Sequence, residues 1–145
     1  MATFLIHETD WAHDAACLSA VRRVVFIDEQ GVPEALEWDE QDAASLHLLA
    51  TGADGAPIGC ARLLPDGHIG RMAVLPAWRG QGVGRALLAA AIRAAQAQGH
   101  TALQLSAQIH AAGFYEAAGF AAEGETYAEA GIPHVAMRLD FPQKR

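Results

Sequence analysis

The part of the sequence that constrains the fold most is a strand-like run, a glycine-rich loop and a long helix in direct succession. Residues 69–75 form a short apolar run between a glycine and a proline, which predicts a β-strand. Residues 83–98 are rich in alanine and leucine, and their apolar side chains recur at the spacing of one helix face. Gly99 is a natural stop for that helix. The chain therefore contains a strand that is followed within a few residues by a helix.

The connecting loop, residues 79–84, has a glycine at every second position. Its backbone N–H groups stay uncovered where a helix presents its first unpaired donors, which favours binding of phosphate oxygens. A Walker A loop needs Gly-Lys-Ser/Thr, but here Gly84 is followed by Arg85. A dinucleotide-binding fingerprint needs another glycine spacing and a later carboxylate, which residues 100–105 lack. A glycine-rich connection that binds nothing remains the alternative.

Composition and charge bound the class of protein. A chain of 145 residues with 52% hydrophobic residues is long enough for one folded domain, which we expect to span residues 1–145. The net charge of −7 argues against nucleic acid or an anionic membrane as a partner and mildly favours a cationic substrate. Cys17 and Cys60 stand alone, and no stretch has the pattern of a signal peptide or membrane span. We therefore expect a cytoplasmic protein without a disulfide or metal centre.

The rest of the chain alternates between strand and helix patterns. Asp54-Gly55 predicts a hairpin turn, and residues 130–133 are expected to link the last two strands. The order of elements predicts an α/β fold, a mixed sheet with helices on both faces. Further helices are predicted at residues 11–29 and 108–118, and further strands at residues 2–8, 45–51, 58–64, 101–106, 120–127 and 135–141.

An acidic segment lies between the first predicted helix and the second strand. Residues 28–42 contain seven carboxylates and no lysine or arginine. Such a run is usually a solvated loop. It could also form an electronegative rim that draws an amine toward a cleft. Val32, Leu36 and Trp38 would anchor such a loop against the body, and both interpretations stay open.

Two motifs resemble those of one enzyme superfamily. Arg-x-x-Gly-x-Gly at residues 79–84 resembles the pyrophosphate loop of the GNAT acetyltransferases. Gly-Phe-Tyr-Glu-Ala-Ala-Gly-Phe at residues 113–120 resembles the later GNAT motif, in which a tyrosine on a short helix precedes Gly-Phe. Residues 25–33, 71–75, 107–108 and 130–134 look like the YjcF-like branch of that superfamily. The resemblance covers nearly the whole chain and implies a single-domain GNAT fold.

The resemblance also implies which residues bind acetyl-CoA as the cosubstrate. Backbone groups of the strand would hold the pantetheine arm and the thioester, and the loop would bind the pyrophosphate. Gln108 stands where the family usually has asparagine, which leaves one side-chain contact to the pantetheine open. The residues assigned to the coenzyme are Met72, Ala73, Val74, Arg79, Gly80, Gln81, Gly82, Val83, Gly84, Arg85 and Gln108.

Acetyl transfer to an amine needs a base, because an alkyl ammonium titrates near ~10.4 and attacks only after it loses a proton. It also needs an acid for the departing thiolate, and Tyr115, which the motif puts near the coenzyme sulfur, suits that role. His134 is the candidate base, in a Pro-His setting that looks like that of the glyphosate-acetyltransferase-like enzymes. Either residue could instead be structural, as a core aromatic or as a strand histidine bonded to a carbonyl group. Glu29, Glu37 and His47 are further candidates on the substrate side and could act through water.

The sequence thus predicts an N-acetyltransferase that moves an acetyl group from acetyl-CoA to a small primary amine by direct attack in a ternary complex. The alternatives are acetylation of a protein N-terminus or lysine, and a non-catalytic sensor that binds acyl-CoA without turnover. The sequence does not identify the acceptor amine. A homodimer is the default expectation for the oligomeric state.

Overall fold

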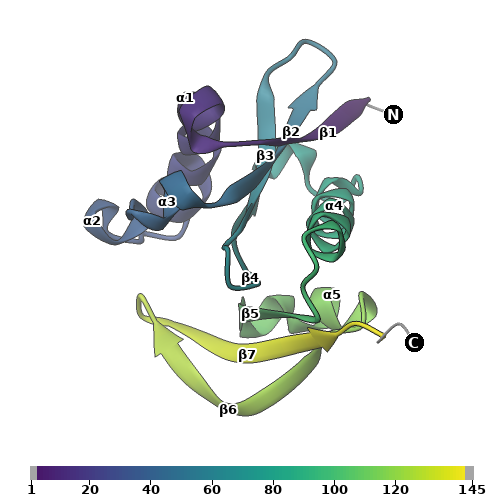
Figure 1. Cartoon of the computed structure of the whole chain (residues 1–145). Helices are drawn as coiled ribbons and strands as arrows, with labels where there is room; N and C mark the ends of the chain where they lie inside the picture. Colours follow the sequence, from purple (N-terminus) through teal and green to yellow (C-terminus); the bar gives the residue numbers. More distant parts are fainter. Residues whose placement is uncertain (1–2, 143–145) are drawn as a thin grey trace.

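A computed structural model describes residues 3–142 of the chain (Figure 1). Ala2, in the predicted opening strand, lies outside the described residues. The strands are β1 (Phe4–Thr9), β2 (Leu46–Gly52), β3 (Pro57–Leu63), β4 (His68–Val74), β5 (Ala102–Gln108), β6 (Ala121–Glu129) and β7 (Ile132–Asp140). The helices are α1 (Trp11–Arg22), the π-helix η1 (Arg23–Glu29), α2 (Glu34–Glu37), α3 (Gln41–Ala44), the 3-10 helix η2 (Pro76–Trp78), α4 (Val83–Ala97), the 3-10 helix η3 (Ile109–Ala111) and α5 (Ala112–Ala117).

The seven strands form one sheet in the order β1-β2-β3-β4-β5-β7-β6. β4 and β5 are parallel and every other neighbouring pair is antiparallel, so the sheet is mixed, as predicted. The sheet is therefore two antiparallel groups, β1 to β4 and β5 to β7, joined by one parallel pair (Figure 1). The long helix α4 connects the two groups, as a parallel pair requires.

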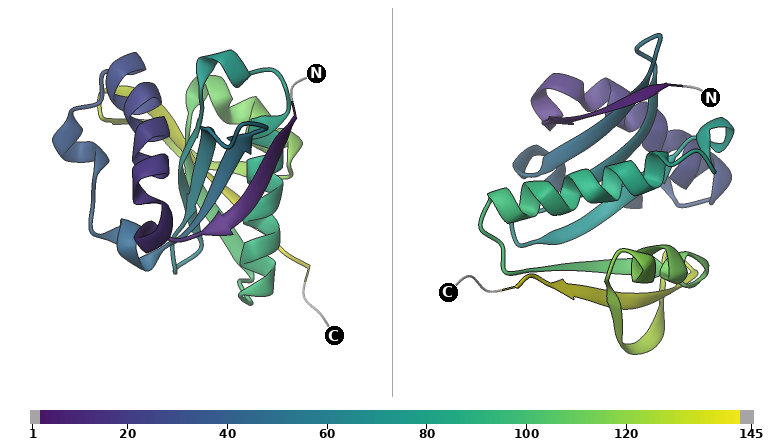
Figure 2. Two further views of the ribbon diagram at one scale, coloured as in Figure 1. Left: turned by 90° about the horizontal axis from the view of Figure 1, so that it is seen from above. Right: turned by 90° about the vertical axis from the view of Figure 1, so that its right-hand side faces the viewer.

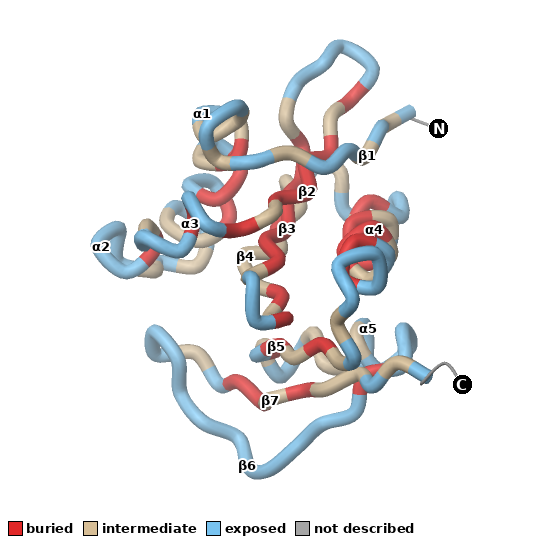
Figure 3. The backbone as a smooth tube through the Cα atoms, in the orientation of Figure 1, coloured by how far each residue is buried: buried red, intermediate tan, exposed pale blue. Residues whose placement is uncertain are grey.

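Helices cover both faces of the first group, as predicted, with α1 on one side and α4 on the other (Figure 2). Successive side chains of a strand point to opposite faces. Leu48 and Ala50 of β2 accordingly pack in the core that contains α4, whereas Leu49 packs with α1. The helices turn their buried residues toward the strands (Figure 3).

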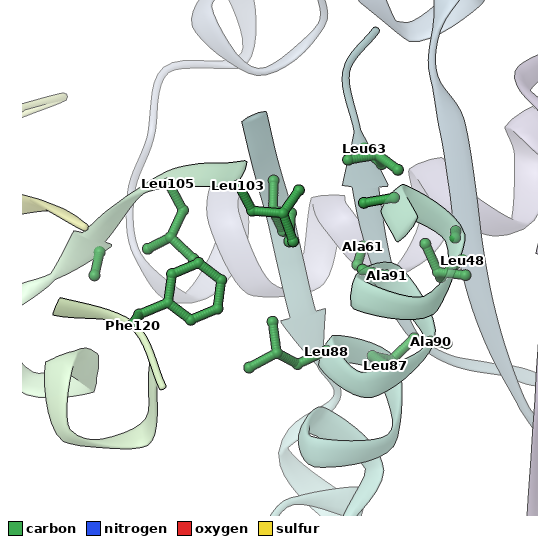
Figure 4. Close-up of a cluster of buried hydrophobic side chains, with 14 of the residues drawn as sticks. Leu48, Ala61, Leu63, Leu87, Leu88, Ala90, Ala91, Leu103, Leu105 and Phe120 are labelled. Atoms are coloured by element: carbon green, nitrogen blue, oxygen red, sulfur yellow. The ribbon is translucent and has the colours of Figure 1, made fainter. Parts of the chain in front are cut away.

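Close packing holds α4 against β3 at a glycine. A Cβ atom at Gly59 would lie 3.0 Å from Leu87 Cδ1 and 3.1 Å from the Ala73 carbonyl oxygen, so a larger residue would push the helix away. Leu87 and Leu88 lie in a cluster that also includes Leu103 and other residues of the second strand group (Figure 4). Because the helix is anchored in this way, its N-terminus and the preceding loop have a fixed position relative to β4.

The predicted helix 11–29 is α-helical only as far as Arg22. Its last turns widen into the π-helix η1, in which the Gln30 N–H bonds to the carbonyl oxygen of Val25, five residues earlier. π-turns recur at functional sites, and this one packs against β4. The apolar stripe continues from the α-helix into the π-helix, so the spacing of apolar residues in the sequence could not reveal where the π-helix begins.

The remaining differences lie in the connections. The predicted helix 108–118 is shorter, because Gln108 ends β5 and the helix consists of η3 and α5. The predicted link 130–133 is a two-residue hairpin turn, in which Ala130 and Gly131 have φ of 52° and 76°. β6 therefore ends later and β7 begins earlier than predicted, at Glu129 and Ile132. The turn predicted around Asp54-Gly55 is confirmed, with the Gly55 N–H bonded to the Gly52 carbonyl oxygen at 2.9 Å.

Candidate active site

The main cleft opens where β4 and β5 part. These strands pair only at His68–Gln104 and Ile69–Leu105. Beyond those residues, both strands line a cleft of about 1330 Å³. Backbone N–H and C=O groups on the two facing edges have no strand partner there, so an extended ligand can take the place of a strand. The sheet thus contains a slot suited to a chain-like ligand with amide groups.

A β-bulge at Arg71 bends β4 just after its last contact with β5. The register with β3 holds at Gly70 and again at Ala73, with one extra β4 residue between them. Arg71 has a φ of 47°, a conformation that costs a residue with a side chain roughly 1–2 kcal/mol. Its guanidinium donates to the carbonyl oxygens of Leu36 and Glu37, at 3.3 and 3.1 Å, which holds the strained conformation.

The glycine-rich loop ends at the N-terminus of α4, beside the same cleft. Gly82 is the N-cap with a φ of 89°, and no side chain caps the helix. The first intrahelical bond runs from the Ala86 N–H to the Gly82 carbonyl oxygen at 3.0 Å, so the N–H groups of residues 83–85 precede it. The first turn contains no acidic residue, and Arg85 adds a positive charge. This helix start can therefore bind an anion such as a diphosphate.

All but one of the residues predicted to bind the coenzyme line the cleft. The exception is Gln81, whose Nε2 donates to the Ala77 carbonyl oxygen at 3.1 Å. The residues that do line it are Met72, Ala73, Val74, Arg79, Gly80, Gly82, Val83, Gly84, Arg85 and Gln108.

Arg79 and Glu29 form a bidentate ion pair at the edge of the cleft. Arg79 Nη1 and Nη2 lie 2.6 and 2.5 Å from the Glu29 oxygens, and Nε donates to the Val74 carbonyl oxygen at 3.0 Å. The hydrogen bonds from Arg79 lower the pKa of the Glu29 carboxyl. Glu29 is therefore a stabilised carboxylate, poorly suited to accept a proton, and it ties the end of η1 to the loop.

A second contact ties the same segment to the opposite wall of the cleft. Gln108, at the end of β5, donates from Nε2 to Gln30 Oε1 at 2.8 Å, and both residues line the cleft. Sequence reasoning assigned Gln108 to the site but missed Gln30. The one available signal was the position of Gln30 within residues 25–33, the stretch that looks like the YjcF-like branch.

Tyr115 projects from α5 into the cleft, close to β4. Its hydroxyl lies 3.8 Å from Met72 Sδ, and the rings of Phe114 and Phe120 pack edge-on against it at 5.1 and 6.1 Å between centroids. Burial raises the pKa of the Tyr115 phenol above its ordinary value. The phenol is consequently neutral over the physiological pH range and can donate a proton.

His134 lies on β7, on the other wall of the cleft, and is 6% exposed. Its Nδ1 lies 2.7 Å from the Ile132 carbonyl oxygen, which can only accept, so Nδ1 carries the proton in the neutral ring. Nε2 then holds the lone pair and lies 3.4 Å from Glu129 Oε2. Tyr127 stacks on the imidazole, and its hydroxyl hydrogen-bonds to Ser106 Oγ. Sequence reasoning did not single out Glu129, Tyr127 or Ser106.

Most carboxylates of the acidic segment 28–42 are paired with arginines. Glu37 and Asp42 are buried, and Arg22 donates to them at 2.7 and 2.8 Å. Burial raises the pKa of Glu37, whose Oε2 also lies 3.1 Å from Arg71 Nε. Most of the segment is exposed, but the pairing of its carboxylates with arginines argues against a free electronegative rim. Its other ion pairs are Glu29–Arg79, Glu34–Arg23, Asp39–Arg62, Asp39–Arg71 and Asp42–Arg62.

His47 lies away from the cleft. It is 1% exposed, and its Nε2 donates to the Asp42 carbonyl oxygen at 2.9 Å. Burial lowers the pKa of the imidazole, which keeps it neutral. The structure therefore brings Glu29, Glu37, Tyr115 and His134 to one cleft and leaves His47 in the packing between β2 and α1.

The described residues contain no cluster of metal ligands. Within residues 3–142, no group of three or more His, Cys, Asp or Glu side chains could hold a metal ion. In the same range, no helix has both the length and the apolar character needed to cross a bilayer. Burial raises the pKa of the Cys60 thiol to about 12, and neither Cys60 nor Cys17 lines the cleft.

The sheet is split between two parallel strands, with an uncapped glycine-rich helix start beside the split, and such a site suits a chain-like ligand that carries amide groups and a diphosphate. Residues 14–141 match the Acetyltransferase (GNAT) domain family. The N-acetyltransferase YjcF of Bacillus subtilis, itself uncharacterised, is 36% identical over 83% of this chain and 88% of the relative. The chain thus belongs to the GNAT acetyltransferase family and is an enzyme with an acyl-CoA cosubstrate.

Solved structures agree with this assignment. An acyl-CoA N-acyltransferase from Pseudomonas aeruginosa has a TM-score of 0.85 and 34% identity, over 94% of this chain and 99% of that one. ElaA of Escherichia coli has a TM-score of 0.84 and 27% identity, over 95% of this chain and 100% of that one. The family resemblance carried by the two motifs and the α/β fold expected from the order of the elements are therefore confirmed.

Proposed function

We propose that the chain transfers an acetyl group from acetyl-CoA to a small primary amine by direct attack in a ternary complex. The observation that carries the proposal is the slot between β4 and β5 with an uncapped helix N-terminus beside it. A pantetheine arm is an extended chain with amide groups, which unpaired strand edges can hydrogen-bond. A diphosphate suits a glycine-rich helix start. Acetyl-CoA carries both groups and ends in the thioester that an amine can attack.

The coenzyme residues divide by the kind of group that they offer. Backbone groups of residues 72–74 on β4 would hold the pantetheine, together with the amide pair of Gln30 and Gln108. The N–H groups of residues 83–85 and the Arg85 guanidinium would hold the diphosphate. The guanidinium of Arg79 is already engaged by Glu29, which supports a role for Arg79 in shaping the loop.

Tyr115 is the proposed acid. When the neutral amine attacks the thioester carbonyl carbon, a C–N bond forms, the C–S bond breaks and the sulfur takes the electron pair as a thiolate. The phenol can give this sulfur its proton, because burial keeps it neutral. The phenolate that results would take the proton that the amine nitrogen loses as the amide forms, which restores the phenol. Its position beside Met72, on the strand assigned to the thioester, supports this role.

His134 is the proposed base. In its neutral form, Nδ1–H is held by the Ile132 carbonyl oxygen, so the Nε2 lone pair is available in the cleft. Nε2 would take the proton that the acceptor ammonium must lose. Direct transfer is supported because neither cysteine lines the cleft and the buried Cys60 thiol, with a pKa of about 12, is not a thiolate nucleophile at neutral pH.

An acceptor screen tests the proposal. The purified protein is mixed with acetyl-CoA and a panel of small primary amines, and release of free CoA thiol is followed. Turnover with at least one amine is expected, together with a measurable heat of binding for CoA. Binding of acetyl-CoA without turnover of any amine would support a sensor, and turnover only with peptides would support a protein acetyltransferase.

Tyr115→Phe is expected to lower kcat about 30-fold. The effect stays below the 100-fold at which the usual range of acid–base catalysis begins, because a thiolate is already a good leaving group. Phenylalanine keeps the edge-on ring packing, so the Kd for acetyl-CoA should stay within twofold. Steady-state kinetics and calorimetry measure the two quantities, and an unchanged kcat would remove Tyr115 from the mechanism.

His134→Ala is expected to lower kcat/KM for the amine and to move the acidic limb of its pH–rate profile upward, toward the ~10.4 at which a free alkyl ammonium loses its proton. Without the imidazole no positioned base takes that proton, so only amine that is already neutral in solution can attack. His7→Ala, on the exposed edge strand β1, serves as the control and should keep the wild-type profile. A His134→Ala profile whose acidic limb stays at its wild-type position would eliminate this base.

A further inference from the structure

Three carboxylates line the cleft within residues 3–142, and two of them are neutralised by arginines. Glu29 is held by Arg79 in a bidentate pair, and Glu37 is held by Arg22 and Arg71. The two carboxylates that the acidic segment brings to the cleft are therefore compensated by arginines of the same chain. They contribute little to the field inside the cleft.

Glu129 is the third carboxylate, and no described lysine or arginine pairs with it. It lies at the end of β6, next to the left-handed turn at Ala130-Gly131, and its side chain is 57% exposed. Its one ion-pair partner within residues 3–142 is His134, with Nε2 at 3.4 Å from Oε2. Glu129 thus brings a negative charge to the β6–β7 side of the cleft.

The imidazole of His134 supplies an independent indication of a ligand. His134 is 94% buried, with Nδ1–H bonded to the Ile132 carbonyl oxygen, while Nε2 has no hydrogen-bond donor among the described residues. In the neutral ring, Nε2 and the Glu129 carboxylate are two acceptors side by side without a donor between them. An ammonium group carries three N–H donors and a positive charge, so it satisfies both acceptors at once.

The other end of the cleft has the opposite charge. Arg85, in the first turn of α4, pairs with no carboxylate of the described residues and adds to the positive helix N-terminus. α4 and the β6–β7 turn lie on different sides of β4 and β5 (Figure 1). The cleft is therefore polarised, with a positive end for an anionic coenzyme and a negative end for a cationic acceptor.

We propose that Glu129 binds the acceptor in its ammonium form and holds it beside Nε2 of His134. The inference rests on the proposed function and specifies its substrate class as small amines that are cationic in solution. The ammonium gives one proton to Nε2, the Ile132 carbonyl oxygen keeps Nδ1–H, and the imidazolium that results faces the Glu129 carboxylate. The neutral amine, with its lone pair free, then attacks the thioester.

Glu129→Gln tests the proposal because it removes the charge and keeps the shape. With the best alkylamine of the acceptor screen, KM for the amine should rise about fivefold to tenfold, which suits a half-exposed charged contact. The Kd for acetyl-CoA should not change. Raising the NaCl concentration should raise the amine KM of the wild type and leave that of Glu129→Gln flat.

Two controls separate charge recognition from a change in shape. Glu125→Gln removes one negative charge from the same exposed strand, where β6 is not paired with β7, and should leave the amine KM unchanged. The alcohol that matches the amine is neutral, so its inhibition constant as a competitor of the amine should be the same in Glu129→Gln and the wild type.

Each result has one consequence. A Glu129→Gln variant with the amine KM of Glu125→Gln would overturn the inference, and so would an alcohol inhibition constant that rises as much as the amine KM. In both cases the acetyltransferase activity itself would stand. A wild-type protein that binds acetyl-CoA but acetylates no amine would instead overturn the proposed function, and the role of Glu129 with it.

Discussion

Replacing Arg22 with methionine is expected to lower the free energy of unfolding by about 3 kcal/mol. The Arg22 side chain is 1% exposed and donates to Glu37 at 2.7 Å and to Asp42 at 2.8 Å. Methionine fills much of the volume without the charge, so two buried carboxylates lose a shared partner. Arg71 and Arg62 still face them, which keeps the loss at the lower end of the range for broken buried ion pairs. Urea unfolding followed by circular dichroism measures the difference.

The neighbouring arginine provides a matched control. Arg23 pairs with Glu34, and both side chains are about half exposed, at 47% and 55%. Arg23→Met should therefore change the unfolding midpoint little, because solvent screens such a pair. Equal stability of Arg22→Met and Arg23→Met would show that the buried cluster does not stabilise the fold. If Arg22→Met loses stability because two buried carboxylates lack a partner, adding Glu37→Gln and Asp42→Asn should recover part of the free energy of unfolding.

The parts of the fold that the sequence predicted are those written in local patterns. The helix α4 follows from its apolar stripe and from Gly99, and the turn between β2 and β3 follows from Asp54-Gly55. The mixed sheet follows from the order of the elements. The coenzyme side of the cleft was accessible for the same reason, because a glycine loop at a helix start is a local feature with its own chemistry.

The fate of the acidic segment could not be predicted, because its partners are distant in the sequence. Glu37 pairs with Arg22 and Arg71, which lie 15 and 34 residues away. No charge pattern within residues 28–42 reveals that these arginines converge beneath the segment. The packing of α1 on the sheet brings them together, and it buries Glu37 and Asp42 of the charge run.

The acceptor side of the site depends on two backbone features with weak sequence signals. Arg71 and Ala130 adopt positive φ, of 47° and 52°, which neither residue type favours alone. The first bends β4 away from β5, and the second turns β6 back into β7 so that Glu129 faces His134. Arg71 is held by its contacts with Leu36 and Glu37, and Ala130 by the pairing of β6 with β7 on either side of the turn. Sequence reasoning therefore found the histidine from its motif and missed the carboxylate beside it.

Replacing Gly82 with alanine is expected to weaken the binding of acetyl-CoA by about 3 kcal/mol, roughly 150-fold in Kd. Gly82 has a φ of 89°, and no atom of residues 3–142 lies within 4 Å of a Cβ built there. Alanine disfavours this φ, so we expect the loop to shift. The N–H groups of residues 83–85 would then no longer point at the diphosphate. A hydrogen bond to a charged group contributes about 1.5–3 kcal/mol, and a methyl group crowding the ligand adds about 1–3 kcal/mol. Calorimetry with acetyl-CoA measures the change.

Gly55→Ala isolates the effect of the ligand from that of backbone strain. Gly55 has a φ of 84° and equally open surroundings, but it lies in the β2–β3 turn, away from the cleft. Both variants should lose similar stability to the strained backbone, and only Gly82→Ala should lose affinity. Gly84→Ala should bind nearly as well as the wild type, because φ there is not positive and its Cβ would lie 3.5 Å from the Phe114 ring, an ordinary contact. If Gly82→Ala and Gly55→Ala bind acetyl-CoA equally well, the phosphates are held elsewhere, and the start of α4 is not the anion site.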